Sequence, residues 1–142
     1  MPTLNAPDYS VSSKRTYASS GTYYASLQGT LQTDPAREDA AIRQVRAGKL
    51  SDLRVAVIES GPTGINSSVT LLRRSAQGWQ ETNLSVTITG GPSYDHQVFQ
   101  DSIPNDAVTF EIGDDLCWKI EANRDAIRWL SLRSICVRAE DQ

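Results

Sequence analysis

Residues 107–139, AVTFEIGDDLCWKIEANRDAIRWLSLRSICVRA, carry the clearest structural pattern in the chain. Apolar and polar side chains alternate in three runs, which is the period of a half-buried β-strand. The side chains expected to face a core are Val108, Phe110, Ile112, Leu116, Trp118 and Ile120. Gly113–Asp115 predicts a hairpin turn between the first two runs. In the third run the apolar phase changes near residues 131–134, which predicts a bulge.

The same alternation extends upstream to residue 53. Turn sequences such as SGPTGINS, SAQG and GGPS separate the apolar runs, and a weaker strand is expected around Val98 and Phe99. Strands that recur every 10–15 residues with turns between them are typical of an antiparallel sandwich. We therefore predict a mainly β protein, with a β-sandwich or jelly-roll-like body of seven or eight strands over residues 51–142.

The first fifty residues have a different composition and do not show this alternation. Residues 1–33 are rich in Ser, Thr, Tyr, Gly and Gln, and they offer little apolar surface for folding. We expect an extended amino-terminal arm that another subunit must stabilise, because ordering a backbone costs about 1–2 kcal/mol per residue. Residues 34–50 predict one short helix and a linker, with Asp34 as N-cap, Pro35 in the first turn and Gly48 beyond the end.

Composition narrows the possible partners. The net charge is −3, and a nucleic-acid-binding protein would need a clustered basic face, so no nucleic-acid partner is predicted. No apolar run approaches the roughly 20 residues of a membrane span. The two cysteines, Cys117 and Cys136, lack the spacing of a zinc site. A disulfide between them and a pair of buried thiols both remain open.

No catalytic motif is present, and we predict neither an enzyme nor a cofactor. His96 lies beside Asp95 and near Ser93, but no nucleophile elbow accompanies it. Glu111 and Glu121 are candidate paired carboxylates for glycoside hydrolysis, although both are expected to point outward from the sheet. A hydrolase would require one of these sets to converge in a cleft.

The residues also offer candidates for two kinds of binding site. Acidic turns could hold calcium, although aspartates in turns more often bond their own backbone, and no metal site is predicted; these turns contain Asp95, Asp101, Asp106, Asp114 and Asp115. The phase of the alternation places Trp118 and Trp129 in the core. Trp79 and Tyr94 are the aromatic side chains expected to be exposed, where they could bind a carbohydrate.

A polar arm, a short helix and a carboxy-terminal β domain together resemble small accessory proteins of tailed bacteriophage virions, of the decoration (cement) type. The resemblance covers the layout of the chain. It implies a non-enzymatic structural protein that is assembled in the host cytoplasm, resides in the virion and binds neighbouring capsid or tail subunits. It also implies a homo-oligomer, with a trimer as one arrangement. A carbohydrate-binding sandwich module, such as a receptor-binding tip, is the alternative.

For the assembly role, the arm and the predicted helix would supply the contacts. Tyrosines suit strand pairing, and arginines form well-oriented pairs with carboxylates of a partner. The expected interface residues are Tyr17, Tyr23, Tyr24, Arg15, Arg37, Arg43 and Arg46.

Overall fold

The computed structural model describes residues 9–30 and 40–141. Nearly all regular structure in these residues is β. The strands are Tyr9–Tyr17 (β1), Gly21–Ala25 (β2), Gly29–Thr30 (β3), Ile42–Arg43 (β4), Gly48–Ser60 (β5), Ser67–Ser75 (β6), Gly78–Ile88 (β7), Val98–Asp101 (β8), Val108–Phe110 (β9), Asp115–Ala122 (β10) and Leu130–Asp141 (β11). Two 3-10 turns, Pro92–Tyr94 (η1) and Pro104–Asp106 (η2), flank β8.

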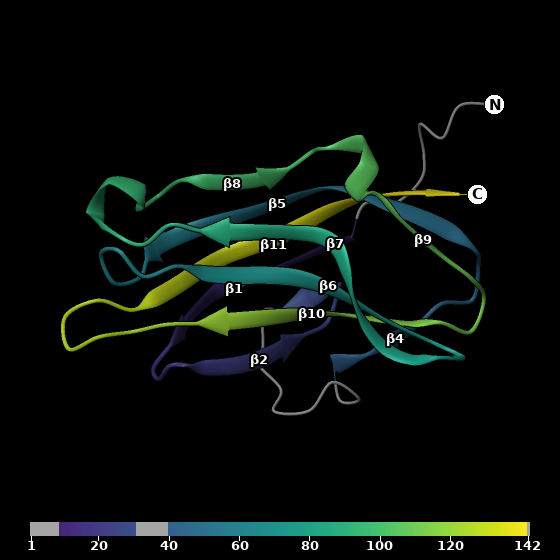
Figure 1. The fold of residues 1–142 in the computed structure, drawn as a ribbon, viewed down its shortest axis with the longest axis horizontal. Helices are drawn as coiled ribbons and strands as arrows, with labels where there is room; N and C mark the ends of the chain where they lie inside the picture. Colours follow the sequence, from purple (N-terminus) through teal and green to yellow (C-terminus); the bar gives the residue numbers. More distant parts are fainter. Residues whose placement is uncertain (1–8, 31–39, 142) are drawn as a thin grey trace.

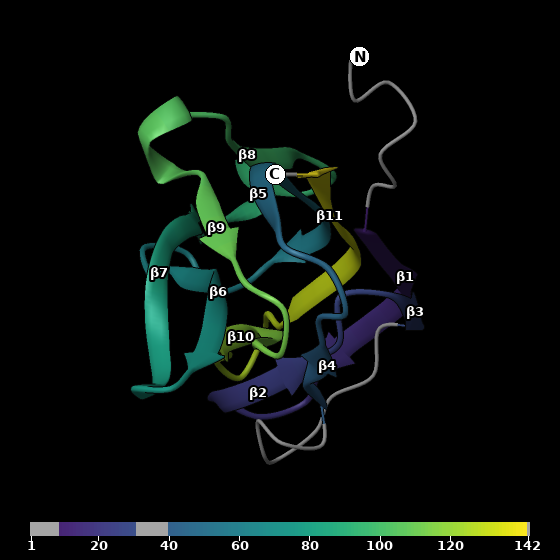
Figure 2. The same ribbon diagram turned by 90° about the vertical axis from the view of Figure 1, so that its right-hand side faces the viewer.

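The strands form two sheets that lie face to face, as Figures 1 and 2 show. Sheet A has the order β3-β1-β11-β5-β8, with β9 also pairing to β5. Sheet B has the order β2-β10-β6-β7, with β4 also pairing to β10. All pairings are antiparallel except that of β1 with β3. The predicted antiparallel β-sandwich is therefore confirmed.

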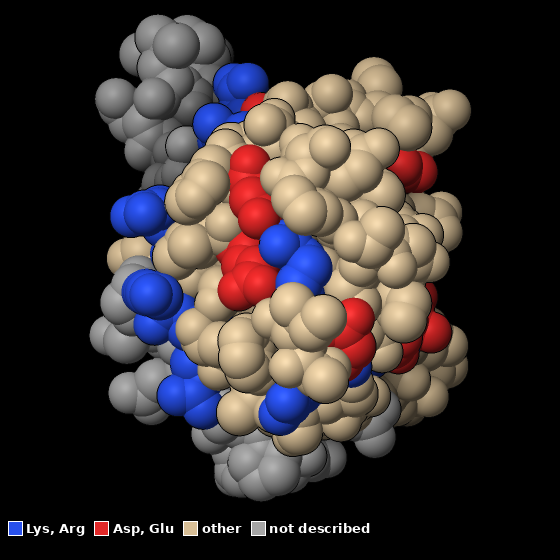
Figure 3. Space-filling model, turned by 90° about the vertical axis from the view of Figure 1, so that its left-hand side faces the viewer, with Lys and Arg blue, Asp and Glu red and all other residues tan. Residues whose placement is uncertain are grey.

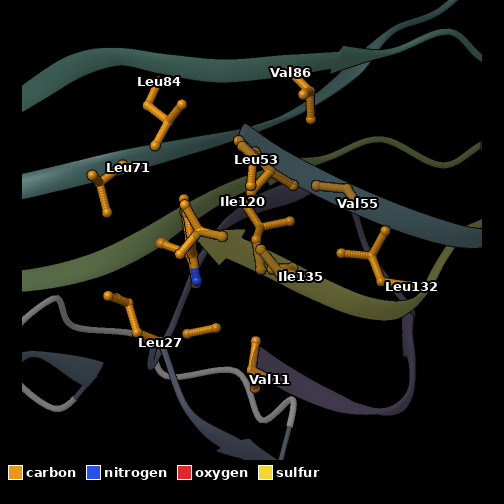
Figure 4. Close-up of a cluster of buried hydrophobic side chains, with 14 of the residues drawn as sticks. Val11, Leu27, Leu53, Val55, Leu71, Leu84, Val86, Ile120, Leu132 and Ile135 are labelled. Carbon is orange, nitrogen blue, oxygen red and sulfur yellow. The ribbon is translucent and has the colours of Figure 1, made fainter. Parts of the chain in front are cut away.

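One hydrophobic core fills the space between the sheets (Figure 4). The alternation of the sequence accounts for most of it, because every second residue of a strand points to the same side. Leu53, Val55 and Val57 on β5 face Leu116, Trp118 and Ile120 of the other sheet, and all are buried. The phase change in β11 is also confirmed: the register of β11 against β5 shifts between residues 132 and 134.

The described part of the predicted arm is instead part of the sandwich. Strand β1 pairs along β11 in sheet A, and β2 pairs along β10 in sheet B. Val11, Ala25 and Leu27 are fully buried in the same core as the rest of the chain. The expectation that foreign surface must order this segment is thus wrong for residues 9–30, since the chain's own sheets supply the surface.

The predicted helix is also corrected where the structure describes it. Residues 34–39 lie outside the described residues, and Ala40 is helical. Ile42–Arg43 then form β4, which pairs with the start of β10, and Gly48 opens β5. The apolar residues at 42 and 45 fit a helical face, but pairing with β10 decides the conformation.

The predicted hairpin at Gly113–Asp115 is a connection between the sheets. Strand β9 pairs with β5 in sheet A, whereas β10 lies in sheet B. Gly113 adopts φ 91°, a conformation that suits glycine. Because the chain leaves sheet A here, Ile112 is 71% exposed and does not join the core as predicted.

Candidate functional site

The outer face of sheet B presents side chains that alternate with the core residues of its strands. Four of them lie in one row across four strands. Arg43 on β4 is opposite Asp115 on β10, Asp115 is opposite Arg74 on β6, and Arg74 is opposite Trp79 on β7. We call Arg43, Asp115, Arg74 and Trp79 the outer row.

Direct contacts link the members of the outer row. The Asp115 carboxylate is only 5% exposed and accepts hydrogen bonds from Arg43, at 3.1 Å from Nε to Oδ1, and from Arg74. The guanidinium carbon of Arg74 lies 5.2 Å from the centroid of the Trp79 ring, within the range of a cation–π contact. Burial acts to raise the pKa of Asp115, but the hydrogen bonds from Arg43 and Arg74 outweigh it and hold that pKa below its ordinary value.

Beside the outer row lies a hollow of about 290 Å³, which we call the Trp79 hollow. Leu72 is buried there and packs with Cys117 and Ala40, while Tyr24 and Trp79 pack partly exposed against this cluster. The residues that line the hollow are Tyr24, Leu72, Trp79, Gln80, Glu81 and Lys119.

Lys119 is the central polar group of the Trp79 hollow. Its Nζ lies 2.6 Å from Oε1 of Glu81 and 3.0 Å from Oε1 of Glu121. Burial acts to lower the pKa of Lys119, but the hydrogen bonds to Glu81 and Glu121 overcome it, so the pKa lies above its ordinary value. The ammonium therefore stays charged at neutral pH, and the hollow offers this cationic donor and the Glu81 carboxylate as an acceptor beside aromatic rings.

The three tyrosines predicted for an interface differ in their exposure and surroundings. Tyr17 is buried, and burial raises the pKa of its hydroxyl. Its ring centroid lies 4.9 Å from that of Tyr23, which is partly buried in the same core cluster. Tyr17 belongs to β1 of sheet A, whereas Tyr23 and Tyr24 belong to β2 of sheet B. Tyr24 alone among them faces the Trp79 hollow.

The predicted arginines have different surroundings. Arg15 is exposed on β1, Arg43 belongs to the outer row, and Arg37 lies outside the described residues. The Nη2 of Arg46 donates to Asp141 at 2.9 Å. Arg43 and Arg46 line one hollow beside the start of β5, whereas Arg15 lies on β1.

The two aromatic residues predicted to bind ligand lie near opposite ends of β7. Trp79 is its second residue, whereas Tyr94 lies in η1 after its end and packs 6.4 Å from Phe99. Trp118 is in the core as predicted. Trp129 is not, because it is partly exposed beneath the guanidinium of Arg124 at 5.3 Å.

The sets considered for catalysis do not converge. His96 is exposed, and the Asp95 carboxylate accepts hydrogen bonds from Ser60 and Arg128. Glu111 precedes β10 and Glu121 lies near its other end, which separates the two by roughly 20 Å at the usual rise of a strand.

Four of the five aspartates in the acidic turns, all except Asp106, accept hydrogen bonds from arginines or from backbone amides. Asp114 accepts from Arg73 at 2.7 Å, and Asp101 accepts from the backbone amides of Ser85 and Ile103. Within residues 9–30 and 40–141, no three His, Cys, Asp or Glu side chains come together as a metal site. Figure 3 shows the end of the sandwich that lies on the left in Figure 1. Near its middle, Asp or Glu side chains lie beside Lys or Arg side chains.

The two cysteines lie on opposite outer faces of the sandwich. Cys117 packs with Leu72 on sheet B, and Cys136 lies beside Ser10 on sheet A, with 3.4 Å between Oγ and Sγ. No disulfide joins them. Cys117 is buried but Cys136 is only partly buried, so the alternative of two buried thiols holds for Cys117 alone.

Sequence reasoning missed Asp115, Arg74, Lys119 and Glu81 as partners of Trp79. The alternation does place the first three on the outer face of their strands, but it does not say which strands are neighbours. The register of β10, β6 and β7 is what brings them together.

Comparison with known proteins yields little similarity. No protein-family model and no curated protein matches the chain. Among solved structures, "CBM35 from Cellvibrio japonicus Abf62" matches with a TM-score of 0.40 and 15% identity, covering 70% of this chain and 62% of that one. The fold assignment rests on the two sheets themselves. No helix within the described residues has the length and hydrophobicity that crossing a membrane requires.

Proposed function

We propose that the protein is a non-enzymatic binding module that holds a carbohydrate ring in the Trp79 hollow. The observation that carries the proposal is the meeting of Trp79 and Tyr24 with the Lys119–Glu81 ion pair around a hollow of about 290 Å³. That volume is at the small end of ligand pockets, and it suits a single sugar ring better than an extended ligand.

The chemistry of the hollow matches that of a sugar. One face of a pyranose is lined with C–H groups, which pack well against an aromatic ring, while its edge carries hydroxyls. The Lys119 ammonium donates to such a hydroxyl and the Glu81 carboxylate accepts from a neighbouring one. Both side chains are already held 2.6 Å apart by their ion pair, so little side-chain freedom is lost on binding.

Titration of the full chain with glucose, galactose, xylose, glucuronate and their short oligomers, followed by NMR, tests the proposal. Trp79→Ala and Lys119→Met should each weaken binding by about 10-fold or more, which corresponds to ~1.4 kcal/mol. Trp129→Ala is the matched control, because Trp129 is also partly exposed but follows the far end of β10. Binding that survives Trp79→Ala, or no binding to any of these sugars, would reject the proposal.

A role as a structural subunit of a larger particle, such as a viral capsid or tail, is the second candidate. Its support is an apolar pair at one end of the sandwich. Val45 is 80% exposed and Ile112 is 71% exposed, and their backbones adjoin because Gly113 N donates to Gln44 O at 2.8 Å. Apolar side chains exposed together favour contact with another protein. Sedimentation of the NMR samples distinguishes the two functions. A monomer that binds sugar supports the carbohydrate-binding module, whereas an oligomer that binds no sugar supports the structural subunit.

A further inference from the structure

We infer that Asp115 is a positioning residue for the Trp79 hollow: acting through Arg74, it holds the Trp79 indole in the orientation that a ligand would meet. This inference rests on the proposed function, because it concerns the same site. It assigns a role to a side chain that does not line the hollow.

The first step is the position of Asp115. As the first residue of β10 it alternates with the core residue Leu116 and so lies on the outer face of sheet B. Its side chain is nevertheless only 5% exposed, whereas that of Arg43 is 67% exposed and covers it from the side of β4. A carboxylate withdrawn from water needs compensating charge and hydrogen bonds, and two guanidinium groups supply them here.

The second step leads from Asp115 to Trp79. Pairing of β6 with β7 fixes the backbone of Trp79 opposite Arg74, but it leaves the two side-chain torsions of the indole open. The Arg74 guanidinium restricts them by lying over the ring, 5.2 Å from its centroid. Arg74 itself has a long, flexible side chain, and its bond to the buried Asp115 is what keeps the guanidinium in place.

The third step is the relation to the hollow. Trp79 contributes to both the outer row and the wall of the Trp79 hollow. Restricting the indole before a ligand arrives removes an entropic cost of binding, so a loosened indole should weaken affinity even though every lining residue is still present.

The test uses the indole N–H signals of the full chain in ¹H–¹⁵N NMR, with the Trp79 signal assigned by its loss in Trp79→Ala. We expect Asp115→Asn and Arg74→Gln to shift and broaden that signal and to weaken sugar binding about 5-fold. Arg43→Ala is the matched control: it removes the other partner of Asp115 but leaves Arg74 in contact with Trp79, and it should move the signal less than either change.

An unchanged Trp79 signal in either folded Asp115→Asn or folded Arg74→Gln would overturn the inference, and so would an equal shift in Arg43→Ala. Circular dichroism verifies that each variant is folded; Arg74→Gln, at a one-third exposed side chain, keeps the test decisive if Asp115→Asn does not fold. The indole readout needs no ligand. A chain that binds no sugar yet shows the expected shifts would therefore reject the proposed function while supporting the positioning role.

Discussion

Leu27 shows at the scale of one residue how the amino-terminal segment is held. It follows β2, is fully buried, and belongs to the core cluster together with Val11 and Ala25. Its neighbours Ser26 and Gln28 are polar, so the local composition conceals a core position. The ordering of residues 9–30 is therefore explained by burial of a few apolar side chains within the same molecule.

Leu27→Ala should lower the free energy of unfolding by about 2–5 kcal/mol, because it leaves a cavity in a closely packed core. Gln28→Ala is the matched control. Because Gln28 is exposed, this variant should change the free energy of unfolding by no more than about 0.5 kcal/mol. Urea unfolding of both variants provides the measurement. A Leu27→Ala variant as stable as the wild type would mean that this segment is not part of the core in solution.

At the scale of elements, the place where β5 pairs with both β9 and β11 requires one small residue. Gly48 opens β5 opposite Phe110 of β9 and Asp141 of β11. A Cβ atom at this position would lie 2.6 Å from Cζ of Phe110 and 2.8 Å from the backbone oxygen of Glu140. The backbone oxygen cannot move without disturbing the pairing of β11 with β5.

We expect Gly48→Ala to destabilise the protein by about 1–3 kcal/mol, as overpacking does in other cores. Gly21→Ala, on β2, has no contact closer than 3.9 Å and should be tolerated. Thermal unfolding of the two variants side by side tests the difference. Equal melting temperatures would show that β9 and β11 adjust freely around position 48.

For the whole molecule, two aspartates tie separate strands and loops together. Asp115 joins β4, β10 and β6 through Arg43 and Arg74, and Asp95 joins the loop after β7 to β5 and to Arg128. For Asp95, as for Asp115, burial acts to raise the pKa, but hydrogen bonds from Ser60 and Arg128 outweigh it and the pKa is lowered.

A carboxyl group whose pKa is lower in the folded state stabilises the protein at pH values above its unfolded pKa, which is about 3.9 for Asp. That contribution is lost as the pH falls from about 4 through the lower pKa of the folded state. The difference in unfolding free energy between the wild type and Asp115→Asn should therefore be largest near neutral pH and shrink below pH 4. Urea unfolding at several pH values measures it, and a difference that grows on acidification would contradict the assignment.

Much of the fold could be read from local patterns. Strand faces alternate with period two, so the inward positions of β5, β7 and β10 and the phase change in β11 were predictable from neighbouring residues alone. The alternation did not identify β1 as a strand of the core, because few of its residues are apolar. In β1, Val11 stands between serines, and nothing in so short a stretch separates a strand of the core from a free arm.

Pairing between distant strands is the part that local patterns leave undetermined. Whether β9 pairs with β10 or with β5, and whether Asp115 faces Arg74, depends on contacts between segments tens of residues apart. The residue order thus establishes an antiparallel β protein and the inward side of most strands, because side-chain direction is a local property of the backbone. Only the folded chain establishes the place of residues 9–30 and the outer row beside the Trp79 hollow. Register and sheet membership are properties of the whole core, because they depend on which faces of all the strands are buried together.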